Sequence, residues 1–130
     1  MSIVNSVKTL FPGMGNATEY VSLLGQTVTA GTSTAFALTG FINYVRSGKI
    51  RFKTTAAPAS STITGIVITG TDGTTTVTLD SRSYVASTAA QLVDYLFEFL
   101  SELNLTTITV TVTEAGGTAP TADLEIAGNP

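Results

Sequence analysis

The sequence contains no cysteine, no histidine and no tryptophan among its 130 residues. Without cysteine, the chain can form neither a disulfide nor a thiolate nucleophile nor a cysteine-based zinc site. Without histidine, it lacks the most common general base and the most common metal ligand. The missing residue types therefore predict a protein that is not an enzyme and that binds no metal and no cofactor.

The remaining polar residues form no motif for catalysis or ligand binding. Gly13-Met14-Gly15 is too short for a dinucleotide-binding loop, and Gly70-Thr71-Asp72-Gly73 is explained as a turn. The nine acidic residues are scattered along the chain, whereas a calcium loop or a glycosidase site needs them clustered or paired. The search for motifs thus agrees with the prediction from composition.

Charge is scarce as well. Charged residues make up 12% of the chain, about half of the usual 25%, and the mean hydropathy is +0.35. Threonine, roughly a fifth of the residues, supplies a polar but uncharged surface. A free monomer normally carries more charge, so we expect much of the surface to be covered in an assembly. The alternative is an ordinary β-domain coated with threonine.

Long apolar runs are missing too. No stretch approaches the roughly 20 apolar residues that a membrane span needs. Polar residues interrupt the apolar ones throughout residues 1–12, which therefore do not resemble a secretion signal. We expect synthesis in a cytoplasm and no association with a membrane.

Alternation of apolar and polar residues predicts β-strands in most of the chain. Asp72-Gly73 predicts a hairpin turn, because glycine accepts the positive φ angle required there. Thr107 to Thr113 alternates strictly, with Ile108, Val110 and Val112 on one face. The predicted strands cover residues 26–30, 35–38, 41–46, 49–53, 63–69, 74–80, 105–113 and 122–127, of which the last two are expected to pair as a hairpin.

One segment predicts a helix, over residues 88–103. Thr88 and Gln91 fit a capping box, and apolar residues that include Leu96 and Leu100 recur at helical spacing. Phe97 lies off this apolar stripe, so it either contacts a partner protein or packs under the N-terminal strands. The predicted fold class is α+β but mostly β: an antiparallel sheet or sandwich with one amphipathic helix and an N-terminal arm.

The domain organisation follows from a cluster of turn-forming residues, Phe11 to Asn16. We expect an arm over residues 1–25 and a single β-rich domain over residues 26–130. The arm is too apolar for a free disordered tail. It therefore either lies on a partner, with Phe11 as a contact residue, or packs on the core of its own domain.

Charges are distributed unevenly along the chain. Residues 1–84 hold all six basic residues and three acids, whereas residues 85–130 hold six acids and no base. The candidate partner-binding residues are four of the bases, Arg46, Lys49, Arg51 and Lys53. A protein partner, such as the acidic half of a neighbouring copy, fits them better than nucleic acid, given the overall acidity. Alternatively, these bases only protect an exposed edge strand.

Several segments give the chain a resemblance to small virion proteins of tailed bacteriophages. They are residues 27–38, 70–80 and 87–92, the threonine-alternating strand at Ile108 and the loop at Gly116. Capsid decoration (cement) proteins and tail proteins share this composition and order of elements. The resemblance implies a virion location after synthesis in the host cytoplasm, many identical copies that form a homo-oligomer, and contact with the major capsid protein or another virion protein.

Three functions remain open at this point. The first is a capsid decoration or cement protein, and the second is a tail-tube or neck protein. The third, of another class, is a carbohydrate-binding adhesin domain. Sugar-binding sites usually need exposed tryptophan or tyrosine, and the four tyrosines do not cluster in the sequence.

Overall fold

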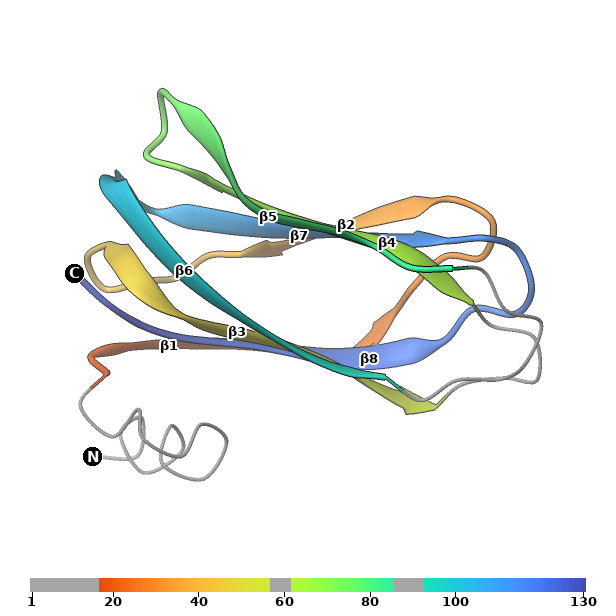
Figure 1. Cartoon of the computed structure of the whole chain (residues 1–130). Coiled ribbons are helices and arrows are strands. Elements are labelled where there is room, and N and C mark those ends of the chain that lie inside the picture. The colour runs from red at the N-terminus through yellow and green to blue at the C-terminus, as the bar shows by residue number, and fades with distance from the viewer. Residues whose placement is uncertain (1–16, 57–61, 86–92) are drawn as a thin grey trace.

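The protein is a sandwich of two four-stranded antiparallel sheets (Figure 1). The structure is a computed structural model that describes residues 17–56, 62–85 and 93–130. Every regular secondary-structure element in these ranges is a β-strand. The strands are β1 (Glu19–Thr27), β2 (Ser33–Leu38), β3 (Val45–Ala56), β4 (Ile63–Thr71), β5 (Thr76–Ser83), β6 (Asp94–Leu105), β7 (Thr107–Glu114) and β8 (Thr121–Asn129).

The order of the strands differs from their order in the chain. Sheet A has the order β1-β8-β3-β6, and sheet B has the order β2-β7-β4-β5. The predicted turn between β4 and β5 is confirmed: the Asp72 amide donates to the Thr75 carbonyl, and Gly73 has a φ of 98°. The predicted hairpin of β7 with β8 is wrong, because the two strands lie in different sheets.

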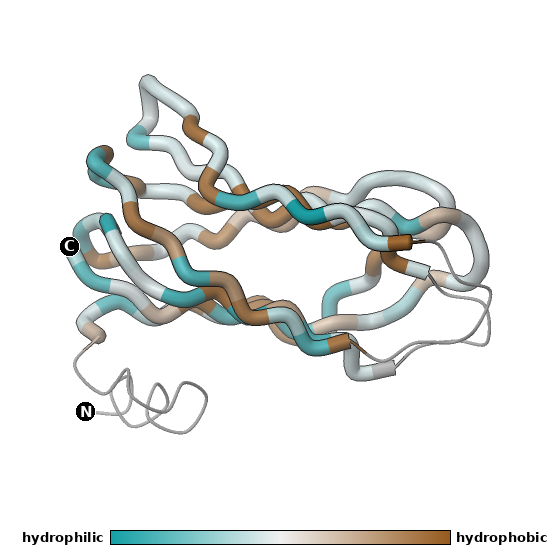
Figure 2. Tube along the Cα trace, in the orientation of Figure 1, coloured by the Kyte–Doolittle hydropathy of each residue, from teal (hydrophilic) through white to brown (hydrophobic). Residues whose placement is uncertain are grey.

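The core lies between the two sheets. Figure 2 shows apolar residues interspersed with polar ones along the strands of both layers. As the alternation predicted, Ile108, Val110 and Val112 of β7 are buried, and so are Leu124 and Ile126 of β8. The side chains of these two strands therefore fill the space between the sheets from opposite sides.

The prediction of an amphipathic helix over residues 88–103 is wrong. Residues 94–105 form β6, whose side chains alternate: those of Leu96 and Leu100 are exposed, and those of Phe97 and Phe99 are buried. Residues 88–92 lie outside the described ranges. β3 explains the strand, because its free edge pairs with β6 from Lys53↔Asp94 to Ser47↔Leu100.

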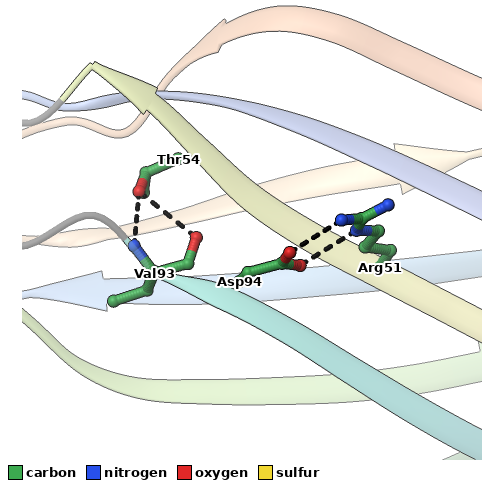
Figure 3. A network of polar contacts seen from close by, with 4 residues as sticks. All are labelled: Arg51, Thr54, Val93 and Asp94. Atoms are coloured by element: carbon green, nitrogen blue, oxygen red, sulfur yellow. Dashed lines mark hydrogen bonds and ion pairs between the residues drawn. The ribbon is translucent and has the colours of Figure 1, made fainter.

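A pair of contacts fixes where β6 begins. The backbone amide of Val93 donates to the Thr54 hydroxyl at 2.7 Å, and the Thr54 amide donates to the Val93 carbonyl at 2.9 Å. Figure 3 shows this hydroxyl beside Val93, one residue before the strand. β3 runs from Val45 to Ala56, so it includes all of the predicted strand 49–53 but only the last two residues of the predicted strand 41–46.

The expected N-terminal arm falls on two different parts of the structure. Residues 19–25 belong to β1, which pairs with β8 in sheet A. The Glu19 carboxylate is buried and accepts the amides of Ile42 and Asn43 at 3.1 and 2.7 Å. Residues 1–16, which include Phe11, lie outside the described residues. The structure described here contains no helix that could span a membrane.

Candidate interaction surface

Charged side chains gather on the outer face of sheet A. They alternate with the core residues of three adjacent strands, so β3 presents its bases between the acids of β6 and those of β8. We call this surface the charged face and define it by Lys49, Arg51, Lys53, Asp94, Glu98, Asp123 and Glu125. Across the described residues, no group of acidic side chains is arranged to hold a metal ion.

Arg51 is the centre of the charged face. Its Nε and Nη2 atoms donate to the two Asp94 carboxylate oxygens at 2.9 and 2.7 Å (Figure 3). The hydrogen bond from Arg51 lowers the pKa of Asp94, and the same bond raises the pKa of Arg51. This fork-shaped contact holds the guanidinium against its own sheet.

Two more of the predicted partner-binding bases also contact their own chain. Lys49 Nζ lies 3.7 Å from Glu98 Oε1. Arg46 Nη2 donates to the Glu102 carbonyl at 2.7 Å. Lys53 faces Asp123 and Asp94 in the register of its two neighbouring strands. The fold therefore brings three of the four bases, Lys49, Arg51 and Lys53, beside acids that are distant in the sequence, whereas Arg46 contacts a backbone carbonyl.

Glu125 lies at the β1 side of the charged face and is only 8% exposed. Burial raises its pKa, while the nearby charge of Arg51 acts in the opposite direction. Tyr20 of β1 donates its hydroxyl to this carboxylate, and burial together with Glu125 raises the pKa of Tyr20 to about 12. The tyrosine therefore keeps its proton at all physiological pH values, and no reactive group results.

Phe97, the other described candidate for partner binding, lies in the core. It is 1% exposed, and the guanidinium carbon of Arg82 lies 4.2 Å from its ring centroid. Of the two alternatives, packing under the N-terminal strands comes nearer to this burial, but the ring lies against Arg82, which belongs to β5. Because side chains alternate along a strand, Phe97 points inward while its neighbours Leu96 and Glu98 point outward.

Two of the four tyrosines meet where the β5 and β6 edges approach each other. Tyr84 and Tyr95 stack with their ring centroids 4.5 Å apart, and Tyr95 also lies 6.3 Å from Phe97. One face of the Tyr84 ring is thus covered by Tyr95. This cluster joins the C-terminal end of β5 to the beginning of β6, on the side where these edges of the two sheets meet.

The other end of that side is open. Between β5 and β6 lies a groove of about 360 Å³, lined among others by Val77, Leu79, Leu100 and Leu103. Next to it, a cleft of about 720 Å³ is lined by Tyr44, Arg46, Asp72, Glu102, Leu103, Asn104 and Thr106. Two charged side chains of the cleft already contact backbone groups: Arg46 contacts the Glu102 carbonyl, and Asp72 the amides of its own turn.

Three leucines are the exposed large apolar side chains of the strands, and the helix prediction had assigned two of them, Leu96 and Leu100, to an apolar stripe. Leu100 is 85% exposed, Leu96 is 47% exposed, and Leu24 of β1 is 61% exposed. A period of two over residues 94–105 could have revealed the first two, since Leu96 and Leu100 alternate with acids there. Leu24 and the β6 leucines lie at opposite edges of sheet A.

Comparisons with known proteins give little further information. The sequence matches no protein-family model and no curated protein. Two solved structures of infectious bursal disease virus contain similar chains. The Gx strain chain is 17% identical, over 85% of this chain and 31% of that chain, with a TM-score of 0.34. The Gt strain chain is 15% identical, over 87% of this chain and 31% of that chain, with a TM-score of 0.31. This chain thus spans about a third of their length, and TM-scores this low carry no argument about its fold or function.

Proposed function

We propose that the protein is a non-catalytic virion structural protein, and that it acts as a decoration or cement protein which binds and stabilises the major capsid shell. Its composition supports this role, because neither histidine nor cysteine is present for catalysis and charge is low. The resemblance of residues 27–38, 70–80 and 87–92 to small phage virion proteins supports it as well.

The observation that carries the proposal is the pairing of opposite charges on the charged face, together with leucines exposed on the edge strands. Arg51 and Lys49 contact Asp94 and Glu98 of the same chain, so the charged face is neutralised locally. Leu100 stands at the edge of sheet A on a strand of 12 residues. Edge strands of free monomers are usually protected by short length or by lysine. A long edge with exposed leucines therefore favours contact with another protein.

Purified particles provide the test. We expect the protein on the surface of the head, and we expect particles that lack it to release their contents at a lower temperature. Re-addition of the wild-type protein restores the stability, whereas the variant Leu96→Ser/Leu100→Ser restores less of it, because its altered β6 edge weakens contact with the shell or with a neighbouring copy on the shell. Val85→Ser is the matched control, because Val85 is 93% exposed but lies outside the strands.

The outcome separates the proposal from its closest alternative. An antibody label along the tail instead of the head would indicate a tail-tube or neck protein. Absence of the protein from purified particles would reject a virion role altogether.

A further inference from the structure

We infer that copies of this chain associate head to tail, with β6 of one copy paired alongside β1 of the next, so that sheet A continues from copy to copy. The inference concerns contact between copies and does not depend on the larger structure to which they attach.

The two strands involved are the edges of sheet A. The order β1-β8-β3-β6 leaves one side of β1 and one side of β6 without a neighbouring strand among the described residues. Both edges carry exposed leucines, Leu24 on β1 and Leu96 with Leu100 on β6. Of the five large apolar side chains exposed within the described ranges, three are these leucines. Both edges thus offer backbone hydrogen-bonding groups next to apolar surface.

The strand directions suit such a junction. All three neighbouring pairs of sheet A are antiparallel, so β1 and β6 run in opposite directions. A second copy placed beside the first in the same orientation therefore sets its β1 antiparallel to β6. Over residues 19–23 of β1, before its irregularity at Leu24 and Gly25, the new pair has the same hydrogen-bond pattern as the rest of the sheet.

The charge pattern disfavours pairing of β6 with itself. Along its outer face, the acids at 94, 98 and 102 alternate with Leu96 and Leu100. Any antiparallel register that sets leucine opposite leucine also sets acid opposite acid, which is destabilising, although the pairing of Asp94 with Arg51 and of Glu98 with Lys49 weakens this repulsion. In the remaining registers a paired leucine faces an acid or Asn104, so the leucines do not meet.

β1 offers β6 an edge without charge. Tyr20, Ser22 and Leu24 alternate with the inward-facing Val21 and Leu23, which are opposite Ile126 and Leu124 of β8. The only acid of the strand, Glu19, is buried against Ile42 and Asn43. No like charge opposes the acids of β6 at this junction, and Leu24 can contact the leucines of β6. Pairing of β1 with a second β1 would leave Leu96 and Leu100 uncovered.

Such a junction is heterologous, so each copy has one donor edge and one acceptor edge. Repeating it produces a closed ring or an open filament, depending on the rotation between copies.

Two variants that block one edge each test the arrangement. Leu24→Glu places a charge on the β1 edge, and Leu96→Glu/Leu100→Glu does so on the β6 edge. Their masses are measured by sedimentation over a concentration series, alone and mixed in equal amounts. Val85→Glu is the control, because it adds the same charge at an exposed position outside both strands. Thermal melting checks that each variant is folded. Should the double variant unfold, Leu100→Ser replaces it.

We expect the wild type and Val85→Glu to form assemblies larger than dimers, and each blocked variant to be a monomer. The mixture should form dimers and nothing larger, because only one intact β6 and one intact β1 remain to pair. Dimers of the β6 variant alone would indicate pairing of β1 with β1, and dimers of Leu24→Glu alone would indicate pairing of β6 with β6. Either of these dimers overturns the inference. A monomeric wild type, or a mixture that forms no dimers, overturns it as well. None of them bears on whether the protein is found in virions.

Discussion

Glu114 and Glu125 are both buried, yet their surroundings act on the two carboxyl groups in opposite directions. Burial alone would raise the pKa of Glu114, but the amides of Thr62, Gly31 and Gly116 outweigh it, and the pKa is lowered. Their hydrogen bonds measure 2.8, 2.9 and 2.6 Å. Glu125 has no such set of backbone donors, and its pKa is raised mainly by burial.

Glu114 should therefore stabilise the fold through its charge. We expect Glu114→Gln to lower the free energy of unfolding by about 1.5–3 kcal/mol at pH 7, the usual range for a hydrogen bond to a charged group. In glutamine an NH2 group replaces one carboxylate oxygen. This group cannot accept a hydrogen bond, so at least one of the three backbone N–H groups would lose its acceptor. Urea denaturation measures the difference, and an unchanged midpoint would contradict the assigned role.

The contribution of Glu114 should also depend on pH. Its pKa in the folded protein lies below the ordinary value of 4.5. The stabilisation is therefore present above pH 4.5 and is lost as the pH falls through that value toward the folded pKa. The stability of Glu114→Gln should fall less steeply than that of the wild type in this range.

Glu125→Gln should have the opposite effect. Because the folded pKa of Glu125 is raised, ionisation costs stability as the pH rises from 4.5 through the folded pKa. We expect Glu125→Gln to be as stable as the wild type at pH 7 or more stable, with the difference disappearing below pH 4.5. A glutamine oxygen can still accept the hydrogen bond from Tyr20. Thermal melting across this pH range checks the sign, and a clear loss of stability at pH 7 would contradict it.

At the scale of the element, β6 shows how two periodicities can coincide in one segment. Leu96, Leu100 and Leu103 fit a helical stripe, whereas Tyr95, Phe97 and Phe99 fit the inner face of a strand. The strand forms because β3 offers a free edge and because Phe97 and Tyr95 lie opposite Ile50 and Phe52. In isolation, neither pattern would prevail over the other.

The strand predicts opposite effects of truncation at two sites. Phe97→Ala should lower the free energy of unfolding by about 3–5 kcal/mol, the usual range for a buried phenylalanine. Leu100→Ala should change it by about 0.5 kcal/mol or less, because its side chain is exposed. A helix would instead make Leu100 the more sensitive position. Chemical denaturation of the monomer, in conditions without self-association, measures both values.

At the scale of the whole molecule, the fold decides how charge is distributed. The bases of β3 and the acids of β6 and β8 are more than 40 residues apart in the chain, but they lie side by side on sheet A. The chain is basic in one part and acidic in the other, yet its charged face carries both signs. Partner binding through the bases alone would have to break contacts such as that of Arg51 with Asp94.

Charge reversal on this face should therefore affect folding. We expect Arg51→Glu/Lys53→Glu to lower the free energy of unfolding by roughly 1–2 kcal/mol at low salt, since each lost pairing is worth up to about 1 kcal/mol. The new glutamates would also repel Asp94, Asp123 and Glu125. In about 1 M salt the loss of stability should shrink, because exposed charges more than about 3 Å apart are then largely screened from each other.

The neutral variant Arg51→Gln/Lys53→Gln is the control for this experiment. It loses the pairings but adds no repulsion, so it should fall between the wild type and the reversed variant. Equal stability of the two variants at low salt would mean that repulsion on the charged face is unimportant.

The features that depend on nearby residues could be predicted from the sequence. The alternation of β7 and of β8 and the turn at Asp72-Gly73 are local, because side-chain direction and the φ of glycine depend on adjacent residues. The lack of histidine and cysteine likewise limits the chemistry whatever the fold.

Three features could not be predicted from the sequence: the strand conformation of residues 94–105, the placement of β7 and β8 in different sheets, and the partners of Arg51. Each of these depends on segments that are distant in the chain. The edge of β3 selects the strand for β6, and with it the exposure of Leu100 and the burial of Phe97. The same pairing places Asp94 beside Arg51. A local pattern of apolar residues sets which side chains can share a face, but the free energy of pairing with a distant strand decides which of the possible faces is buried.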